Sequence, residues 1–213
     1  MRVIDLFSGL GGFSQAFLDR GHDVTRYDNN ERFRDVHNTI IKDVLDLTSR
    51  DITDADIILA SPPCTCFSFA SQGKYHPRLK APHEAVFKSV HLVEHAINII
   101  KEANPTFWIL ENPVGRLRGY IGKPSAKTTW AAWGTIYKKP THLWGILPPV
   151  DWKIAHTWIG DKTGGAGNGA IDSPYPTDPA EIAIIPYDFS LAVCLAVEGN
   201  SQQLTLKEAQ GER

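Results

Sequence analysis

The sequence predicts an open α/β fold, in which a mostly parallel sheet carries helices on both faces. Short β-branched segments such as 56–60 alternate with amphipathic segments such as 84–103. Strands joined in this way pair in parallel through right-handed crossovers. A length of 213 residues is enough for one domain with a buried core.

The first part of the chain predicts four strands and one helix. The apolar run at 3–7 leads into a glycine turn and then a helix over about 13–20, which Gly21 ends. Three further strands are predicted at 24–27, 39–41 and 56–60.

The second part predicts two long helices with strands between them. Apolar residues spaced by four and three mark a helix over 84–103, and Asn104-Pro105 ends it. Strands are predicted at 106–110 and 142–146. A last helix is expected from Asp188 to Gly199, and the Gly- and Pro-rich stretch 160–179 is expected to be a loop.

Composition excludes several classes of protein. The formal net charge of −2 excludes a protein that coats nucleic acid by bulk charge, although a local basic face remains possible. Three cysteines are an odd number, which argues against a disulfide framework and favours a cytoplasmic location. Apolar runs such as 57–60 are far shorter than a membrane span, and the sequence enters a strand at once, so neither a membrane segment nor a signal peptide is expected.

Glycines and acids follow the predicted strands, where open α/β sheets bind ligands. Gly9, Gly11 and Gly12 let the backbone approach a ligand and expose helix amides to an anion. Asp28 ends the second strand, where it could hold a ribose diol, and Asp43 follows the third, where it could accept from an adenine amine. The G-x-G-G spacing differs from the dinucleotide pattern. An adenosyl ligand is therefore favoured over a simple tight turn.

A thiol and a carboxyl group follow two other strands. Pro62 and Pro63 stiffen the turn that presents Cys64, and a thiolate held beside a ligand site can act as a nucleophile. Glu111 follows an apolar strand, and desolvation there raises the pKa toward that of a general acid. Taken singly, an inert buried cysteine and a solvated glutamate are common. Their place on one sheet edge favours the catalytic interpretation.

Together these segments resemble the cytosine-5 DNA methyltransferase family. The matching motifs are Asp5-Leu-Phe-Ser-Gly-Leu-Gly-Gly-Phe13, Pro62-Pro-Cys64 with Phe67-Ser68, and Glu111-Asn-Pro113, over roughly residues 1–145. The resemblance implies a Rossmann-like S-adenosylmethionine-dependent methyltransferase fold. It also implies methyl transfer from S-adenosylmethionine to C5 of cytosine in DNA, through a covalent bond between Cys64 and C6. S-adenosylhomocysteine would be the product.

The resemblance assigns roles residue by residue. Phe7 would lie against the adenine, and Glu111 would hydrogen-bond N3 of cytosine. The expected cofactor contacts are Phe7, Ser8, Gly9, Gly11, Gly12, Asp28, Asn29, Asp43, Val44 and Pro62. The expected substrate contacts are Pro63, Ser68, Asn112, Arg116 and Arg118, and the catalytic residues are Cys64, Glu111 and Lys139, with no metal.

The chain also departs from the family pattern. Pro113 replaces the usual valine, and the Gln-x-Arg-x-Arg motif is absent, which leaves Lys139 as the candidate basic partner. Only about 40 residues separate Ile146 from the last helix, where the family inserts a large target-recognition domain. Gly199-Asn200-Ser201 follows that helix and is taken as a chance match to the family's closing motif. These features indicate a minimal, phage- or virus-type member.

Four regions are therefore expected. They are a catalytic, cofactor-binding domain at 1–150, a loop-rich remnant of the recognition domain at 151–185, a returning helix at 186–200 and a polar tail at 201–213. Because so little recognition domain remains, a partner protein that supplies sequence recognition is possible.

A basic stretch favours a nucleic-acid surface. Residues 115–142 hold six Lys and Arg and no acid, with Trp130, Trp133 and Tyr137 between them. Cations there would contact phosphate and aromatics would stack on bases of DNA whose target cytosine is flipped out or single-stranded.

Other functions remain open at this point. RNA or a free cytosine nucleotide is an alternative substrate, and a catalytically idle binding protein is an alternative function. The H-x-x-E-H pattern of His91, Glu94 and His95 resembles a zinc-protease motif, but these residues share a solvent face and lack a third ligand.

Overall fold

The computed structural model describes residues 1–69, 72–75, 82–135, 138–152 and 178–210. Its seven-stranded sheet has the order β3-β2-β1-β4-β5-β7-β6. The strands are β1 (Arg2–Leu6), β2 (Asp23–Asp28), β3 (Thr39–Ile41), β4 (Ile57–Ala60), β5 (Phe107–Pro113), β6 (Ala126–Thr129) and β7 (Pro140–Ile146). The helices are α1 (Gln15–Asp19), α2 (Gln72–Tyr75), α3 (Glu84–Ala103), α4 (Arg118–Ile121), α5 (Pro179–Ala183) and α6 (Tyr187–Gln210).

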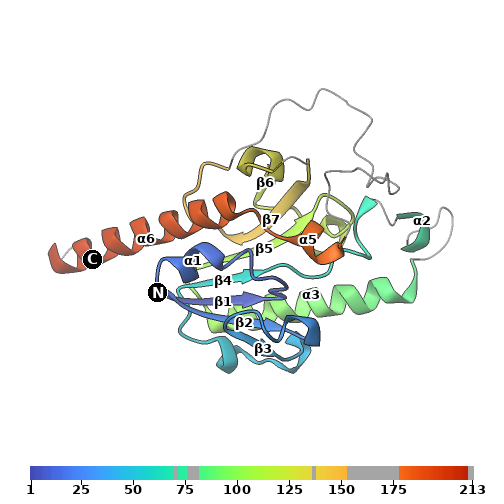
Figure 1. The fold of residues 1–213 in the computed structure, drawn as a ribbon, viewed down its shortest axis with the longest axis horizontal. Helices are drawn as coiled ribbons and strands as arrows, with labels where there is room; N and C mark the ends of the chain where they lie inside the picture. The colour runs from blue at the N-terminus through green and yellow to red at the C-terminus, as the bar shows by residue number, and fades with distance from the viewer. Residues whose placement is uncertain (70–71, 76–81, 136–137, 153–177, 211–213) are drawn as a thin grey trace.

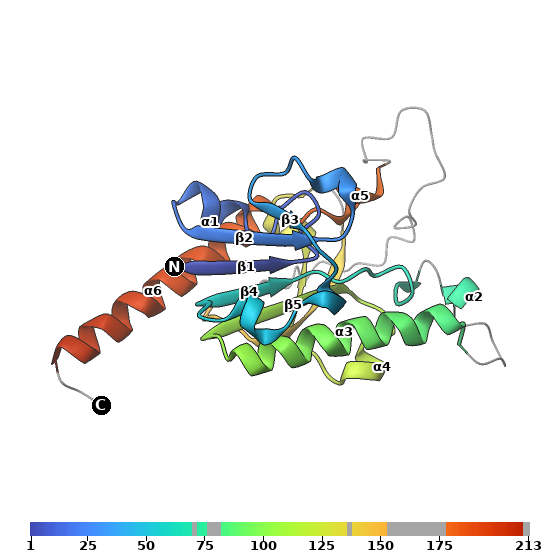
Figure 2. The same cartoon turned by 90° about the horizontal axis from the view of Figure 1, so that it is seen from below.

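Five strands of the sheet run in parallel, and β7 is antiparallel to both of its neighbours. Helix α3 covers one face of the sheet, and α1 with α6 covers the other (Figures 1 and 2). This arrangement confirms the expected Rossmann-like fold with helices on both faces.

The core consists of two apolar layers separated by the sheet. Alternate residues of β4 enter alternate layers: Ile58 and Ala60 pack in the layer of α3, while Ile57 and Leu59 pack in the layer of α1 and α6. All four are fully buried, as is typical of a central parallel strand. Burial of a side chain such as Ile58 contributes roughly 1.5–3 kcal/mol.

Helix α3 has the predicted bounds. The His83 ring accepts from the Ala85 amide at its start, and Asn104 adopts a left-handed conformation at its end, with φ 51°. Its buried residues include Val86, Val93 and Ile100, which belong to the predicted apolar stripe.

One prediction about strands was wrong, and one strand was missed. Glu111 and Asn112 lie inside β5 rather than after it, because antiparallel pairing with β7 extends the ladder to Pro113. Strand β6 was not predicted, since its sequence Ala-Lys-Thr-Thr is short and polar. Helix α1 begins at Gln15 rather than near Phe13, and Ser14 is its N-cap.

The end of the last helix was also predicted wrongly. Helix α6 continues through Gly199 to Gln210, so the segment expected to be a polar tail is helical to that point. The Gly199-Asn200-Ser201 triplet therefore lies inside the helix. Most of the predicted loop 160–179 lies outside the described residues. At its end, Asp178 accepts from the Ala180 amide and caps α5.

Helix α6 also fastens the glycine turn that follows β1. The Ser190 hydroxyl donates to the Phe13 carbonyl at 2.7 Å and accepts from the Ala16 amide at 3.2 Å. The chain just before α6 lies equally close, because a Cβ on Gly12 would fall 2.8 Å from the Ile185 carbonyl oxygen.

One segment of the described residues, Pro179–Gly199, has the length and hydropathy of a membrane span. The sequence prediction considered uninterrupted apolar runs, and Glu181 and Asp188 interrupt the apolar residues of this segment. However, 39% of that segment's window is buried within the fold, and Phe189, Val193 and Cys194 are fully buried in the layer beside α1. Packing against the sheet thus accounts for much of its apolar character.

Candidate active site

The strand register brings four predicted strand ends to one edge of the sheet. Leu6 pairs with both Tyr27 and Ala60, and Ala60 pairs with Leu110. The residues that come next in each strand or turn are Phe7, Asp28, Ser61 and Glu111. The adenosyl-binding and catalytic residues expected from the sequence are therefore neighbours at the carboxyl edge of the parallel strands.

The turn after β1 is held by the Asp28 carboxylate. Asp28 accepts from the Gly9 amide through Oδ2 and from the Asn30 amide through Oδ1, both at 2.9 Å. Phe7 adopts φ 59°, a conformation that non-glycine residues seldom take and that is often found at ligand sites. Gly9 is left-handed as well, with φ 51°.

A second carboxylate is fixed beside the first. Asp43 accepts from the Asn29 side chain and from the Leu45 amide, each at 2.9 Å. Val44, which follows it, is buried in the core layer of α3. The predicted cofactor contact at Val44 thus has a packing role, and its contact with a ligand stays a prediction.

Two of the motif glycines are explained by packing. A Cβ on Gly11, whose φ is 78°, would lie 2.5 Å from Cζ of Arg26. Gly12 lies equally tightly against Ile185. These close approaches require glycine whether or not an anion binds, so the predicted contact of Gly11 and Gly12 with the cofactor stays a prediction.

Sequence reasoning missed a buried polar network beneath this turn. The Ser14 hydroxyl donates to Asp5 at 2.7 Å and accepts from Nε of Arg26 at 2.8 Å. Arg26 also donates to the Gly11 carbonyl at 3.0 Å. Burial raises the pKa of Asp5 to about 6, although Ser14 and Arg26 oppose the shift. The signal was an arginine between Val24 and Tyr27, the two apolar residues of strand β2.

The Cys64 loop is a tight turn attached to β5. The Phe67 and Ser68 amides both donate to the Cys64 carbonyl at 2.9 Å. The Asn112 side chain donates to the Pro62 carbonyl at 2.9 Å, and this bond is buried. Asn112, predicted to contact substrate, therefore acts on the loop that carries the thiol.

A second attachment involves Gly115, which sequence reasoning also missed. Gly115 forms an isolated antiparallel bridge with Ser68, and the Arg116 amide donates to the Phe67 carbonyl at 2.8 Å. A Cβ on Gly115 would lie only 2.2 Å from that carbonyl oxygen. The loop and the chain after β5 are thus in direct backbone contact.

Three ionisable groups interact at this point. Glu111 is 3% exposed, and burial raises the pKa of its carboxyl, partly offset by the Lys139 charge and the Thr141 hydroxyl. Burial also raises the pKa of the half-buried Cys64 thiol, while Lys139 lowers it and Glu111 raises it further. The three predicted catalytic residues therefore influence one another electrostatically, and their roles in catalysis stay a prediction.

Thr141 joins this group without having been predicted. Its hydroxyl lies 3.5 Å from Oε1 of Glu111 and donates to the Lys139 carbonyl at 3.0 Å. Antiparallel pairing of β7 with β5 places it there, opposite Pro113. The sequence held no local signal for that pairing.

Only some of the residues predicted to contact substrate are exposed. Pro63, Arg116 and Arg118 are exposed, and the two arginines line an open hollow of about 480 Å³ together with Phe69 and Tyr120. Lys123, Lys127 and Lys138 are also exposed.

The prediction that the aromatic residues of this stretch stack on bases was wrong for both tryptophans. Trp130 and Trp133 are buried in the core, with ring centroids 5.1 and 5.3 Å from that of Phe189. Tyr137 lies outside the described residues.

The residues of the zinc-protease pattern lie on α3, away from this edge. His91 and Glu94 are exposed, and the His95 ring lies 3.1 Å from the Leu47 carbonyl oxygen.

Comparison with known proteins identifies the family of this chain. The family model for C-5 cytosine-specific DNA methylases matches residues 1–123. A Frog virus 3 protein named as a probable DNA (cytosine-5)-methyltransferase is 32% identical over 162 residues, which cover 70% of this chain and 73% of the viral one. The Fusobacterium nucleatum type II methyltransferase M.FnuDI is 30% identical over 126 residues, covering 55% of this chain.

The extent of these matches differs. The matched part is 33% of the length of the Fusobacterium enzyme, against 73% of the viral protein. Among solved structures, the S. pombe Dnmt2 methyltransferase aligns with a TM-score of 0.46 and 15% identity, covering 68% of this chain and 49% of that one. The family model alone spans more than half of the sequence and includes all three motifs. This chain belongs to the C-5 cytosine-specific DNA methylase family.

Proposed function

We propose that this protein transfers a methyl group from S-adenosylmethionine to C5 of cytosine in DNA, with Cys64 bonded temporarily to C6. The observation that carries the proposal is the buried hydrogen bond from Asn112 to the Pro62 carbonyl, which holds the Cys64 loop against β5 next to Glu111, while the Lys139 charge acts on both groups. Membership of the methylase family supports the same reaction.

The residues at this edge fit S-adenosylmethionine. The buried hydroxyls of Ser8 and Ser61, which follow β1 and β4, have no hydrogen-bond partner among the described residues. Buried polar groups are usually paired, so these two are suited to a polar ligand. Asp28 and Asp43 supply fixed acceptors for ribose hydroxyls and an adenine amine. When bound, the cofactor supplies an electrophilic methyl group on its sulfonium.

The chain's own residues perform the acid and nucleophile steps. The Cys64 thiolate adds to C6 of cytosine while the Glu111 carboxyl donates a proton to N3, which makes C5 nucleophilic. After C5 has been methylated, a solvent water takes the C5 proton, the C6–S bond breaks and N3 returns its proton to Glu111. Cys64 and Glu111 thus return to their starting states.

The neutral form of Glu111 favours both proton donation to N3 and ionisation of the Cys64 thiol. Burial raises the pKa of Glu111, so the protonated form needed at N3 is stabilised. An ionised Glu111 raises the pKa of Cys64, whereas Lys139 lowers it. A neutral Glu111 beside a charged Lys139 therefore favours the thiolate as well as the acid. This pairing gives Lys139 a function in a chain that lacks the family's arginine motif.

The DNA would bind across the exposed cations near the Cys64 loop. Arg116 and Arg118 contact phosphates in this proposal, which provides affinity without sequence information. The target cytosine must leave the duplex or start single-stranded, because a stacked base cannot present C6 to a thiol. With few groups to read base edges, we expect a target of about two to four bases. A partner protein would be the route to a longer site.

A mechanism-based substrate tests the proposal directly. A fluorine at C5 blocks loss of the C5 substituent, so a 5-fluorocytosine oligonucleotide should trap the enzyme as a covalent adduct in the presence of S-adenosylmethionine. Mass spectrometry should place that adduct on Cys64, and Glu111→Gln should trap far more slowly because an amide supplies no proton. RNA and cytidine nucleotide are tested in parallel. Adduct formation on either, with none on DNA, would replace the substrate proposed here.

A further inference from the structure

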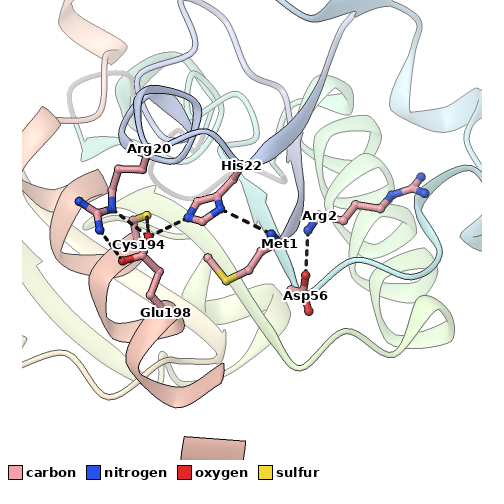
Figure 3. A network of polar contacts seen from close by, with 7 residues as sticks. All are labelled: Met1, Arg2, Arg20, His22, Asp56, Cys194 and Glu198. Carbon is pink, nitrogen blue, oxygen red and sulfur yellow. Dashed lines mark hydrogen bonds and ion pairs between the residues drawn. The ribbon is translucent and has the colours of Figure 1, made fainter. Parts of the chain in front are cut away.

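A second cluster of reactive side chains lies at the opposite edge of the sheet. His22 precedes β2, and Cys194 and Glu198 lie one turn apart on α6, as Figure 3 shows. Among the residues that the structure describes, these three form the group whose potential ligand atoms all lie within 4.8 Å of one another. The cluster is separate from the methylation site, and the reaction does not use it.

The donor set and spacing are those of a transition-metal site. Nε2 of His22 lies 2.9 Å from Oε1 of Glu198, and Sγ of Cys194 lies 4.0 Å from the same oxygen. With metal–ligand bonds of about 2.0–2.3 Å, tetrahedral ligands stand about 3–4 Å apart. Nδ1 of His22 faces the Met1 amino group at 3.5 Å, so Nε2 is the nitrogen turned toward the cluster.

We propose that His22, Cys194 and Glu198 bind a zinc ion that ties α6 to the turn before β2. Three protein ligands leave the fourth position for water. The side chains of His22 and Glu198 are 14% and 20% exposed, which gives the ion a route from solvent. A bound ion would join the last helix to the first half of the fold.

Arg20 competes with the metal for the carboxylate. Its guanidinium donates to both oxygens of Glu198, at 2.9 and 2.7 Å, and its side chain is 41% exposed. A metal must displace this group, and the exposed guanidinium can move into solvent. The Cys194 thiol must also lose its proton, because the thiolate is the form that binds a metal. Zinc binding therefore releases protons.

Cobalt titration of the full chain tests the proposal, because cobalt occupies zinc sites and a thiolate ligand gives a charge-transfer absorption band. We expect one cobalt per chain with that band, displaced by zinc. Cys194→Ser should abolish the band, and the matched control Cys66→Ser should retain it. His22→Gln should weaken binding by about tenfold or more. Absence of the band, or its survival in Cys194→Ser, overturns the proposal.

Arg20→Gln provides a test that removes none of the proposed ligands. Without the competing guanidinium, cobalt should bind more tightly than in the wild-type chain. Unchanged or weaker binding would mean that the cluster is only an ion-pair network that fastens α6. Circular dichroism of each variant identifies any that fail to fold. If Cys194→Ser fails to fold, the cobalt affinity of Arg20→Gln tests the proposal instead.

Discussion

Gly115→Ala tests whether backbone contact sets the position of Cys64. The new Cβ would lie 2.2 Å from the Phe67 carbonyl oxygen, with backbone rather than a flexible side chain in its way. Ordinary carbon–oxygen contacts are about 3.3–3.6 Å, so the two segments must separate by roughly 1 Å. We expect the loop to move, because its two hydrogen bonds with the Cys64 carbonyl let it shift as a unit.

A displacement of this size should lower both turnover and stability. Misplacing a reacting group by roughly 1 Å can lower turnover by about 100-fold. Overpacking typically costs about 1–3 kcal/mol of stability. Cofactor affinity should change little, because Asp28 and Asp43 lie on other strands. The assays are methyl transfer at saturating DNA, cofactor binding by calorimetry, and thermal unfolding.

Gly119→Ala is the matched control. It lies four residues away in α4, and a Cβ there would meet nothing within 4 Å. Alanine inside a helix stabilises by roughly 0.5–1 kcal/mol relative to glycine, so this variant should keep full activity. The reasoning is refuted if Gly115→Ala methylates at the wild-type rate, or if it loses cofactor binding and turnover together.

Three further predictions follow from the site. Asp28→Ala should weaken S-adenosylmethionine binding, since each charged hydrogen bond lost costs roughly 1.5–3 kcal/mol; unchanged affinity in calorimetry would remove Asp28 from the pocket. Cys64→Ser should abolish methyl transfer while keeping cofactor affinity, whereas Cys66→Ser should cost far less, and the opposite ranking would identify Cys66 as the nucleophile. Burial raises the pKa of Asp5 to about 6 from 3.8, so its contribution to stability is full below pH 3.8 and is lost as the pH rises through 6. Denaturant unfolding across that range should therefore show a downward slope that Asp5→Asn lacks, and equal slopes would contradict the burial of an ionised carboxyl.

The elements that the sequence predicted well are those whose pattern is local. Helix α3 carries its own stripe, cap and stop, and β3 has its predicted bounds at Thr39–Ile41. The end of β5 and the whole of β6 depend on pairing with β7, which no local pattern encodes. Gly199 was read as a helix stop because glycine often ends helices, but inside α6 it remains helical.

In the candidate site too, features set by local sequence were predicted and features set by contacts between distant segments were not. Asp28 ends β2, and Glu111 follows the part of β5 that pairs in parallel with β4, so their convergence was predictable. The side chains that hold the site in place were not, because Thr141 and Gly115 act through contacts between distant segments. Trp130 was misread because composition alone does not distinguish a core aromatic from an exposed one.

The attachment of α6 to the glycine turn has a consequence for the order of folding during synthesis. Ser190 contacts Ala16 and Phe13 across 174 and 177 residues of sequence. The turn beside the proposed cofactor site can therefore form its hydrogen bonds with Ser190 only after nearly the whole described chain has left the ribosome. Contacts so distant in sequence slow folding, because the loop between them must close first. A fragment ending at residue 123, which contains all three family motifs, would lack α6, which covers one face of the sheet together with α1.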